Sequence, residues 1–360
     1  MELNVSQENP MKPSRLPLFM LMLAAVMLLT ACGAPASVSW PGLAVDQDTI
    51  YLADTNAVYA IQAVNGSLIW RYPETADTAR LFFAAPAVAN GSIVTGDYSH
   101  QIVGLDSAGK ETWSYKDATG RYIGSAAISE DLVVAPNEDG QVYALTTAGA
   151  LKWTFKSTQA FWTKPVLSGE FVYVTGMDHY LYALKADNGN IAWKVDLGGP
   201  ITSSPLLSED GKLYVGTLAS ELAAIDANNG SVLWKAKLNG GIWGKPVLKD
   251  GVLMVGDAGG KIQGIDANTG TIKWTVDAES PITGGGAQLG DGVVYGTEAG
   301  TILFIKWDGS KGWSQTQKGK IYTDAVSFTD GVALAIDDGD KLLIAYGLNG
   351  QELWSFTAPK

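Results

Sequence analysis

The sequence predicts an all-β protein, an eight-bladed β-propeller with four antiparallel strands in each blade. Three observations lead to this prediction: a tryptophan that recurs about every 40 residues, a glycine four residues before it, and a hydrophobic alternation with a period of two. The 360 residues are 46% hydrophobic and 17% charged, which is enough apolar material for a large core.

Each repeat is marked by the same pair of residues, a glycine followed four positions later by a tryptophan. Successive tryptophans are 43, 40, 40, 41, 40, 39 and 41 residues apart, a period typical of propeller blades. The glycines are Gly66, Gly109, Gly149, Gly189, Gly230, Gly270, Gly309 and Gly350. The tryptophans are Trp70, Trp113, Trp153, Trp193, Trp234, Trp274, Trp313 and Trp354.

Within a repeat the alternation predicts four short strands joined by turns rich in Gly, Asn and Asp. In the fifth repeat these strands are expected at residues 204–207, 212–216, 221–226 and 231–234. The first repeat begins near Val38 and the eighth ends near Ala358, so each repeat supplies its own four strands. We therefore expect the ring to close by packing of the first blade on the last. A β-helix is the alternative, but its coils are shorter than this repeat.

The first 31 residues predict a secretory signal peptide. Lys12 and Arg15 precede an apolar run at 16–31, which is shorter than the roughly 20 residues of a transmembrane helix. The run ends in Leu-Thr-Ala before Cys32, which resembles the lipobox of bacterial lipoproteins. That resemblance implies cleavage before Cys32 and lipidation of its thiol. An uncleaved anchor helix is the alternative, and Met11 is a second possible start.

These boundaries predict three parts: a lipoprotein signal peptide at 1–31, a lipidated cysteine with a short tether at 32–37, and the propeller at 38–360. The acyl chains would anchor the protein in a lipid bilayer. Gly33 follows the cysteine. By analogy with lipoprotein sorting, we expect the protein in the outer membrane facing the periplasm if the organism has one. Otherwise we expect it on the outer face of the cytoplasmic membrane.

The repeat resembles that of a known propeller family. Residues 264–274, Gly-Ile-Asp-Ala-Asn-Thr-Gly-Thr-Ile-Lys-Trp, are similar to the tryptophan-docking motif of PQQ-like (quinoprotein-type) propellers. The resemblance covers residues 38–360. It implies that the eight repeat tryptophans pack between adjacent blades and are structural.

Residues that carry enzymatic or metal chemistry are scarce. The chain has one cysteine, and its two histidines, His100 and His179, fall in turns between the second and third strands of different blades. The acidic residues 337–340 also fall at a turn, which favours a solvated hairpin over a Ca²⁺ site. We therefore expect no catalytic residue, no metal site and no cofactor. The net charge of −12 argues against a nucleic-acid partner, because phosphate binding needs clustered Lys and Arg.

A candidate partner-binding rim comes from aligning the repeats on the proline that begins most inner strands. One and three places before this proline, the residues differ from repeat to repeat, although the scaffold repeats. These places should surround one mouth of the central channel, where variation favours a grafted function. Large aromatic and charged side chains stand there in Phe83, Trp162, Lys164, Trp243, Lys245 and Tyr322. The alternative is that the two tryptophans plug the channel.

A lipid anchor on such a propeller resembles the BamB family of outer-membrane assembly lipoproteins. The resemblance implies a non-catalytic scaffold that binds envelope proteins, a BamA-type barrel among them. Two alternatives stay open: a PQQ-like propeller that binds a small ligand or cofactor as a sensor, and a quinoprotein oxidoreductase. Quinoprotein alcohol dehydrogenases have an adjacent cysteine pair against the cofactor, which a chain with one cysteine does not supply.

Overall fold

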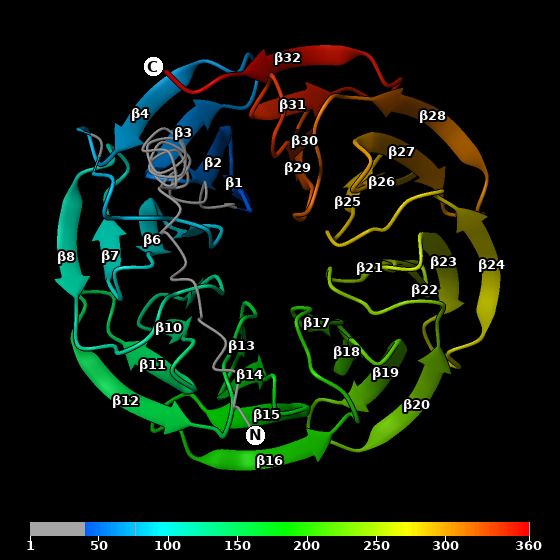
Figure 1. The fold of residues 1–360 in the computed structure, drawn as a ribbon. Coiled ribbons are helices and arrows are strands. Elements are labelled where there is room, and N and C mark those ends of the chain that lie inside the picture. The colour runs from blue at the N-terminus through cyan, green and yellow to red at the C-terminus, as the bar shows by residue number, and fades with distance from the viewer. Residues whose placement is uncertain (1–39, 76, 360) are drawn as a thin grey trace, which may run out of the picture. The chain divides into compact units, whose positions relative to one another are not determined.

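Residues 40–75 and 77–359 are described by the computed structural model, and all lie in one compact unit, Ser39–Lys360. The predicted signal peptide, Cys32 and the tether lie outside these residues. The described part is a ring of eight sheets, shown in Figure 1. In this part no residue is helical, so none belongs to a helix that could cross a membrane. The predicted all-β, eight-bladed propeller is confirmed.

Each sheet, called a blade and numbered in chain order, contains four consecutive antiparallel strands. Blade 1 is β1 (Gly42–Asp46), β2 (Thr49–Asp54), β3 (Ala57–Gln62) and β4 (Leu68–Tyr72); blade 2 is β5 (Ala87–Ala89), β6 (Ser92–Gly96), β7 (Ile102–Leu105) and β8 (Glu111–Tyr115). Blade 3 is β9 (Ala127–Ile128), β10 (Val133–Pro136), β11 (Gln141–Leu145) and β12 (Leu151–Lys156); blade 4 is β13 (Val166–Ser168), β14 (Phe171–Thr175), β15 (Tyr180–Lys185) and β16 (Ile191–Asp196).

The second half of the ring repeats this plan. Blade 5 is β17 (Leu206–Leu207), β18 (Lys212–Gly216), β19 (Glu221–Asp226) and β20 (Val232–Lys237); blade 6 is β21 (Val247–Lys249), β22 (Val252–Gly256), β23 (Lys261–Asp266) and β24 (Ile272–Asp277). Blade 7 is β25 (Ala287–Leu289), β26 (Gly292–Gly296), β27 (Thr301–Lys306) and β28 (Lys311–Thr316); blade 8 is β29 (Val326–Phe328), β30 (Gly331–Ala335), β31 (Leu343–Tyr346) and β32 (Glu352–Phe356). In blade 5 the inner strand is shorter, and the outer strand longer, than the sequence pattern predicts.

A β-bulge recurs between the third and fourth strands of every blade. In blade 5 the register shifts between Ala224 and Ile225, directly after Ala224 pairs with Trp234. Seven blades have alanine or glycine opposite the repeat tryptophan, which leaves room for the indole on that face. In blade 7, Phe304 comes at this place, and its ring stacks on Trp313 with centroids 5.7 Å apart.

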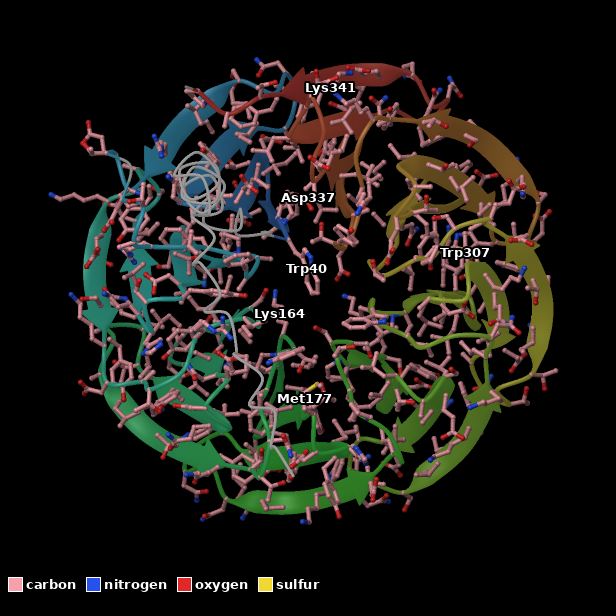
Figure 2. The ribbon with its side chains drawn as sticks, in the orientation of Figure 1. Trp40, Lys164, Met177, Trp307, Asp337 and Lys341 are labelled. Atoms are coloured by element: carbon pink, nitrogen blue, oxygen red, sulfur yellow. The ribbon has the colours of Figure 1, made fainter. Side chains whose placement is uncertain are left out.

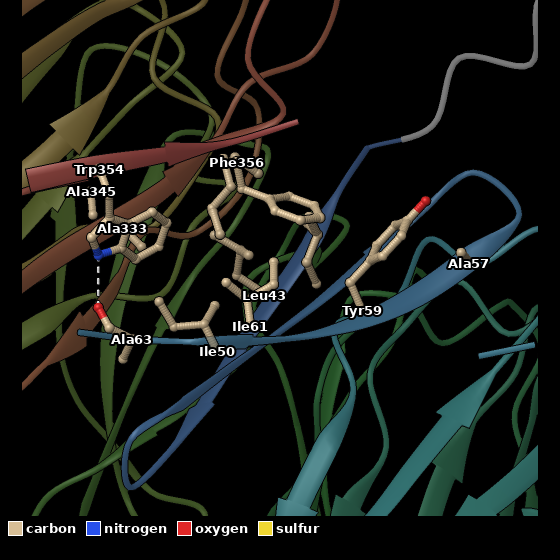
Figure 3. Packing of buried hydrophobic residues seen from close by; sticks show 13 residues of the cluster. Leu43, Ile50, Ala57, Tyr59, Ile61, Ala63, Ala333, Ala345, Trp354 and Phe356 are labelled. Carbon is tan, nitrogen blue, oxygen red and sulfur yellow. Dashed lines mark hydrogen bonds between the residues drawn. The ribbon is translucent and has the colours of Figure 1, made fainter. Parts of the chain in front are cut away.

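The hydrophobic core is divided into clusters that lie between adjacent blades. The cluster that joins blade 1 to blade 8 contains Ile50, Ile61, Leu343 and Trp354, and Figure 3 shows its packing. The Trp354 indole N–H donates to the carbonyl of Ala63 at 2.8 Å, so the last blade docks directly on the first. As the repeat boundaries predict, the ring closes with no strand shared between the ends of the chain.

The repeat glycine lies against the tryptophan of the preceding blade. At all eight glycines φ is between 72° and 87°, and an added Cβ would lie 2.5 to 2.7 Å from an indole carbon. Glycine is therefore required twice over at this place, by the positive φ and by the close approach. Seven of the eight indole N–H groups also donate to a backbone carbonyl of the next blade, at 2.8 to 3.1 Å.

Candidate binding site at the channel mouth

The connections between blades carry side chains to the centre of the ring. In each connection a buried residue donates its backbone N–H to the turn between the second and third strands of the preceding blade. Examples are Phe161 to Asn137 at 3.1 Å and Ile242 to Thr217 at 3.0 Å. The residues that follow this buried anchor are those one and three places before the inner-strand proline. The anchor therefore fixes the direction in which these variable side chains point.

The variable side chains line one cavity of about 750 Å³, which we call the channel mouth. All eight blades contribute to its wall, and all six residues of the predicted rim lie on it. Figure 2 shows Trp40 and Lys164 near the centre of the ring. Trp162 and Trp243 are among the residues that line this cavity. The rim residues that the structure brings together here are Phe83, Trp162, Lys164, Trp243, Lys245 and Tyr322.

An aromatic group crosses the mouth. Trp40 of blade 1 makes an edge contact with Trp243 of blade 6, with centroids 6.5 Å apart. The Trp40 ring also lies 5.9 Å from the ring of Tyr322 in blade 8, and Trp40 remains 46% exposed. Phe83 is held separately, stacked on Tyr98 with centroids 4.0 Å apart. The mouth therefore presents a partly exposed aromatic wall, in which Trp40, Trp243 and Tyr322 contact one another.

Three charged groups stand at the same ring position in alternate blades: Lys164 in blade 4, Lys245 in blade 6 and Asp324 in blade 8. Asp324 Oδ1 accepts the backbone N–H of Gly285 at 2.5 Å. The Asp324 side chain is open to the cavity, but protein atoms are packed closely around it. This burial raises the pKa of Asp324. The hydrogen bond from Gly285 and the charges of Lys245 and Lys164 oppose the rise. Burial, and then repulsion by Lys245, lower the pKa of Lys164.

Several buried polar atoms of the mouth have no hydrogen-bond partner in the described structure. They are the indole nitrogen of Trp162 and the hydroxyls of Thr202, Thr283 and Thr323. A second cavity, of about 550 Å³, lies between the β9–β10 and β13–β14 turns of blades 3 and 4. None of the residues that line this second cavity has such an unpartnered atom among the described residues. The channel mouth is thus the better candidate for a binding site.

The donor set of the mouth does not fit a metal ion. Glu298 and Asp324 are the carboxylates on its wall, and a Ca²⁺ ion takes six to eight oxygen ligands. Within residues 40–75 and 77–359, no group of three or more His, Cys, Asp or Glu residues is placed to hold a metal. His100 and His179 lie in the β6–β7 and β14–β15 turns. Asp338 and Asp340 are exposed in the β30–β31 turn, where Asp340 pairs with Lys318 at 2.9 Å.

Sequence reasoning did not select Trp40, Asp324 or the three threonines as site residues. Trp40 and Asp324 stand in the column one place before the proline, and Thr202 and Thr283 stand in the column three places before it. Selection for large aromatic and basic residues therefore passed over Asp324 and these threonines, and it also missed Trp40, which is as large as the residues selected. Position in the repeat is the signal that finds these four residues, whereas Thr323 stands two places before the proline position, in neither column.

The sequence model of the family described as outer membrane protein assembly factor BamB matches residues 33–160, 145–212 and 177–358. This chain belongs to the BamB family. The match spans nearly all of the propeller, so it includes every connection that forms the channel mouth. No curated protein matches the chain.

Solved structures with the same fold include a BamB and several enzymes. BamB from Moraxella catarrhalis is 18% identical with a TM-score of 0.69, over 86% of this chain and 91% of that chain. Quinohemoprotein alcohol dehydrogenase ADHIIG from Pseudomonas putida HK5 is 15% identical with a TM-score of 0.73, over 90% and 78% of the two chains. A europium-containing methanol dehydrogenase is 14% identical with a TM-score of 0.70, over 83% and 84%. At these identities the likeness shows the BamB-type propeller fold alone.

Proposed function

We propose that this BamB-family protein is a non-catalytic scaffold of the cell envelope that binds other proteins through its channel mouth. The single observation that supports this role is the wall of the mouth. All eight blades contribute to the wall, at positions where the repeat varies, and it combines aromatic anchors with charged groups. Aromatic anchors in a partly desolvated pocket are typical of the residues that dominate protein–protein binding.

The anchor at Cys32 completes the proposal. With the signal peptide 1–31 removed, the acylated cysteine and the tether 32–37 would hold the propeller 38–360 close to a membrane surface. The partner would then be another envelope protein, for which the family description points to a component of outer-membrane protein assembly such as a BamA-type barrel. The same description supports a place in the outer membrane.

Site-directed photocrosslinking in native membranes tests this role. A photoreactive phenylalanine analogue at Trp162 or Phe83 should capture a BamA-type barrel reproducibly. The matched control places the same analogue at Phe171, which lines the second cavity at the β13–β14 turn. Capture from the Phe171 position and not from the mouth would contradict the proposed surface. No capture of an assembly component from either position would contradict the scaffold role.

The cavity itself favours one second candidate, a small-ligand binding protein. Its volume of about 750 Å³ lies within the range of ligand pockets, roughly 300 to 1,000 Å³. Native mass spectrometry of the protein released from its own membranes distinguishes the two roles. A stoichiometric small mass that is lost in Trp243→Ala would favour the ligand-binding role over the scaffold.

A further inference from the structure

The channel mouth contains two ammonium groups that interact with the charge of Asp324 but form no direct ion pair with it. Lys164 and Lys245 line the cavity from blades 4 and 6. Neither forms an ion pair with a carboxylate of the described residues. They are close enough for the charge of Lys245 to lower the pKa of Lys164, second to the effect of burial. Both side chains are exposed on the wall of the cavity, and two neighbouring cations that repel each other favour an anion between them.

Asp324 supplies that anion only weakly. Its Oδ1 atom is engaged by the Gly285 N–H, and burial raises its pKa, so it holds a negative charge less readily than an ordinary aspartate. Glu298 borders the cavity from the β26–β27 turn. Within the described part of the chain, Glu298 forms no ion pair with either lysine. The two lysines therefore remain available to a ligand.

Residues on the wall of the mouth also contain polar atoms without a hydrogen-bond partner in the described structure. The Trp162 indole N–H is a donor only, and the hydroxyls of Thr202 and Thr283 can each donate. A buried donor without a partner costs about 1–3 kcal/mol, so most such atoms in folded proteins are paired. These atoms are themselves buried, so the donors exposed to the cavity are the two ammonium groups, which suit a negatively charged oxygen acceptor such as a carboxylate.

The rest of the wall is apolar and selects what carries the carboxylate. Trp40 and Trp243 form an aromatic contact across the mouth. Below the charged ring, the inner strands contribute aliphatic side chains, among them Val45, Val88 and Leu248. A strongly hydrated anion alone would leave this surface without a partner. An anion flanked by aromatic or aliphatic groups would cover it.

We propose that the channel mouth binds an acidic segment of a partner polypeptide, a Glu or Asp flanked by aromatic or aliphatic residues, with its carboxylate between Lys164 and Lys245. This inference rests on the proposed function and specifies the chemistry of the partner. A polypeptide is the chosen occupant because the family to which the chain belongs is described as an assembly factor. The carboxylate of the segment complements Lys164 and Lys245, which form no ion pair in the part of the chain that the structure describes, although the wall also carries Glu298 and Asp324.

Two matched peptides test the proposal on the purified full-length protein in an uncharged detergent. The probe is acetyl-Phe-Glu-Phe-amide, and its neutral match is acetyl-Phe-Gln-Phe-amide, each titrated at low salt by calorimetry and tryptophan fluorescence. We expect the Glu peptide to bind at least about tenfold more tightly than the Gln peptide. The double variant Lys164→Gln/Lys245→Gln should remove this difference.

A control variant and a variant of opposite sign sharpen the test. Lys110→Gln removes an exposed lysine before β8 and should leave the affinity unchanged. Asp324→Asn removes the competing carboxylate and should tighten binding of the Glu peptide roughly two- to fivefold. Equal binding of both peptides, no binding of either at millimolar concentration, or an equal loss in Lys110→Gln would overturn the proposal.

A small-acid control separates the possible sources of the carboxylate. If 3-phenylpropionate binds as tightly as the Glu peptide, the site takes a small acid and the polypeptide proposal is wrong. Failure here is distinguishable from failure of the scaffold role. Photocrosslinks from the mouth to an assembly component that persist in the double lysine variant would retain the scaffold and reject the acidic segment.

Discussion

The seam between blades and the channel mouth occupy equivalent places in all eight repeats, yet their sequences behave in opposite ways. At the seam, the same glycine and the same tryptophan recur in every blade, because each makes the same contact with a neighbouring copy. At the mouth, the residues include Trp, Lys, Thr, Ser and Asp. Repetition is retained where a blade contacts a blade. It is lost where the side chains meet something other than the scaffold.

The first way to break this comparison is to disturb the seam at its closest contact. Gly270→Ala places a Cβ 2.6 Å from the indole of Trp234 at a φ of 74°, and we expect a loss of about 3 kcal/mol or more in the free energy of unfolding. Gly251→Ala is the matched control, because its φ is 75° but nothing lies within 4 Å of the added carbon. It should cost about 1 kcal/mol.

Urea denaturation of the two glycine variants measures the difference. Both variants carry the same cost of a positive φ. The difference between their losses in the free energy of unfolding therefore measures the contact between one blade and the next. Equal losses in Gly270→Ala and Gly251→Ala would show that the repeat glycine serves the turn alone. The seam would then not depend on the close approach of the indole.

This seam also shows what the sequence can and cannot predict. The spacing of glycines and tryptophans predicts the number of blades and the four strands of each, because both follow from local alternation and turn residues. The partner of each tryptophan is not local. Gly270 lies four residues before Trp274 in the sequence, but in space it contacts Trp234 of the preceding blade. That pairing depends on the order of blades around the ring.

The mouth was predictable as a position and not as a set of contacts. Alignment of the repeats placed the six rim residues around one channel, and the structure places them on one cavity. The contact of Trp40 with Trp243 joins blades 1 and 6, and the Gly285–Asp324 hydrogen bond joins blades 7 and 8. Such contacts depend on the diameter of the ring and the direction of each connection. No local pattern in the sequence encodes either quantity.

The second prediction makes the same substitution in both regions. Trp234→Phe removes part of a seam indole and the hydrogen bond that it donates to the Ala267 carbonyl at 3.0 Å. We expect a loss of about 2 kcal/mol in the free energy of unfolding. Trp162→Phe should cost less than about 1 kcal/mol, because its indole N–H has no partner to lose. Urea denaturation of the full-length protein gives both values.

A larger loss in Trp162→Phe than in Trp234→Phe would contradict the division between seam and mouth. The binding assay provides the reverse comparison. Trp162→Phe should weaken binding of the Glu peptide, since it removes part of the aromatic surface of the mouth, whereas Trp234→Phe should leave the affinity unchanged. A seam variant that weakens binding as much as the mouth variant would show that the two regions are coupled.

The smallest expected effect is a gain in stability at the mouth. Burial raises the pKa of Asp324 above its ordinary value of 3.8, so folding costs more when this carboxyl group is ionised. Its most favourable contribution is present below the ordinary value and is lost as the pH rises through the folded-state pKa. Asp324→Asn keeps an oxygen that can accept the Gly285 N–H. It should therefore stabilise the protein at pH 7 by less than about 1 kcal/mol, because water in the cavity screens the charge.

Chemical denaturation at pH 7 and at pH 3 tests the sign as well as the size of this effect. The advantage of Asp324→Asn should vanish at the lower pH, where the wild-type carboxyl group is protonated in both folded and unfolded states. A variant that is less stable than the wild type at pH 7 would mean that Asp324 stabilises the ring in the way seam residues do. A more stable variant would mean that the mouth retains a charge at some expense to folding, as residues kept for binding commonly do.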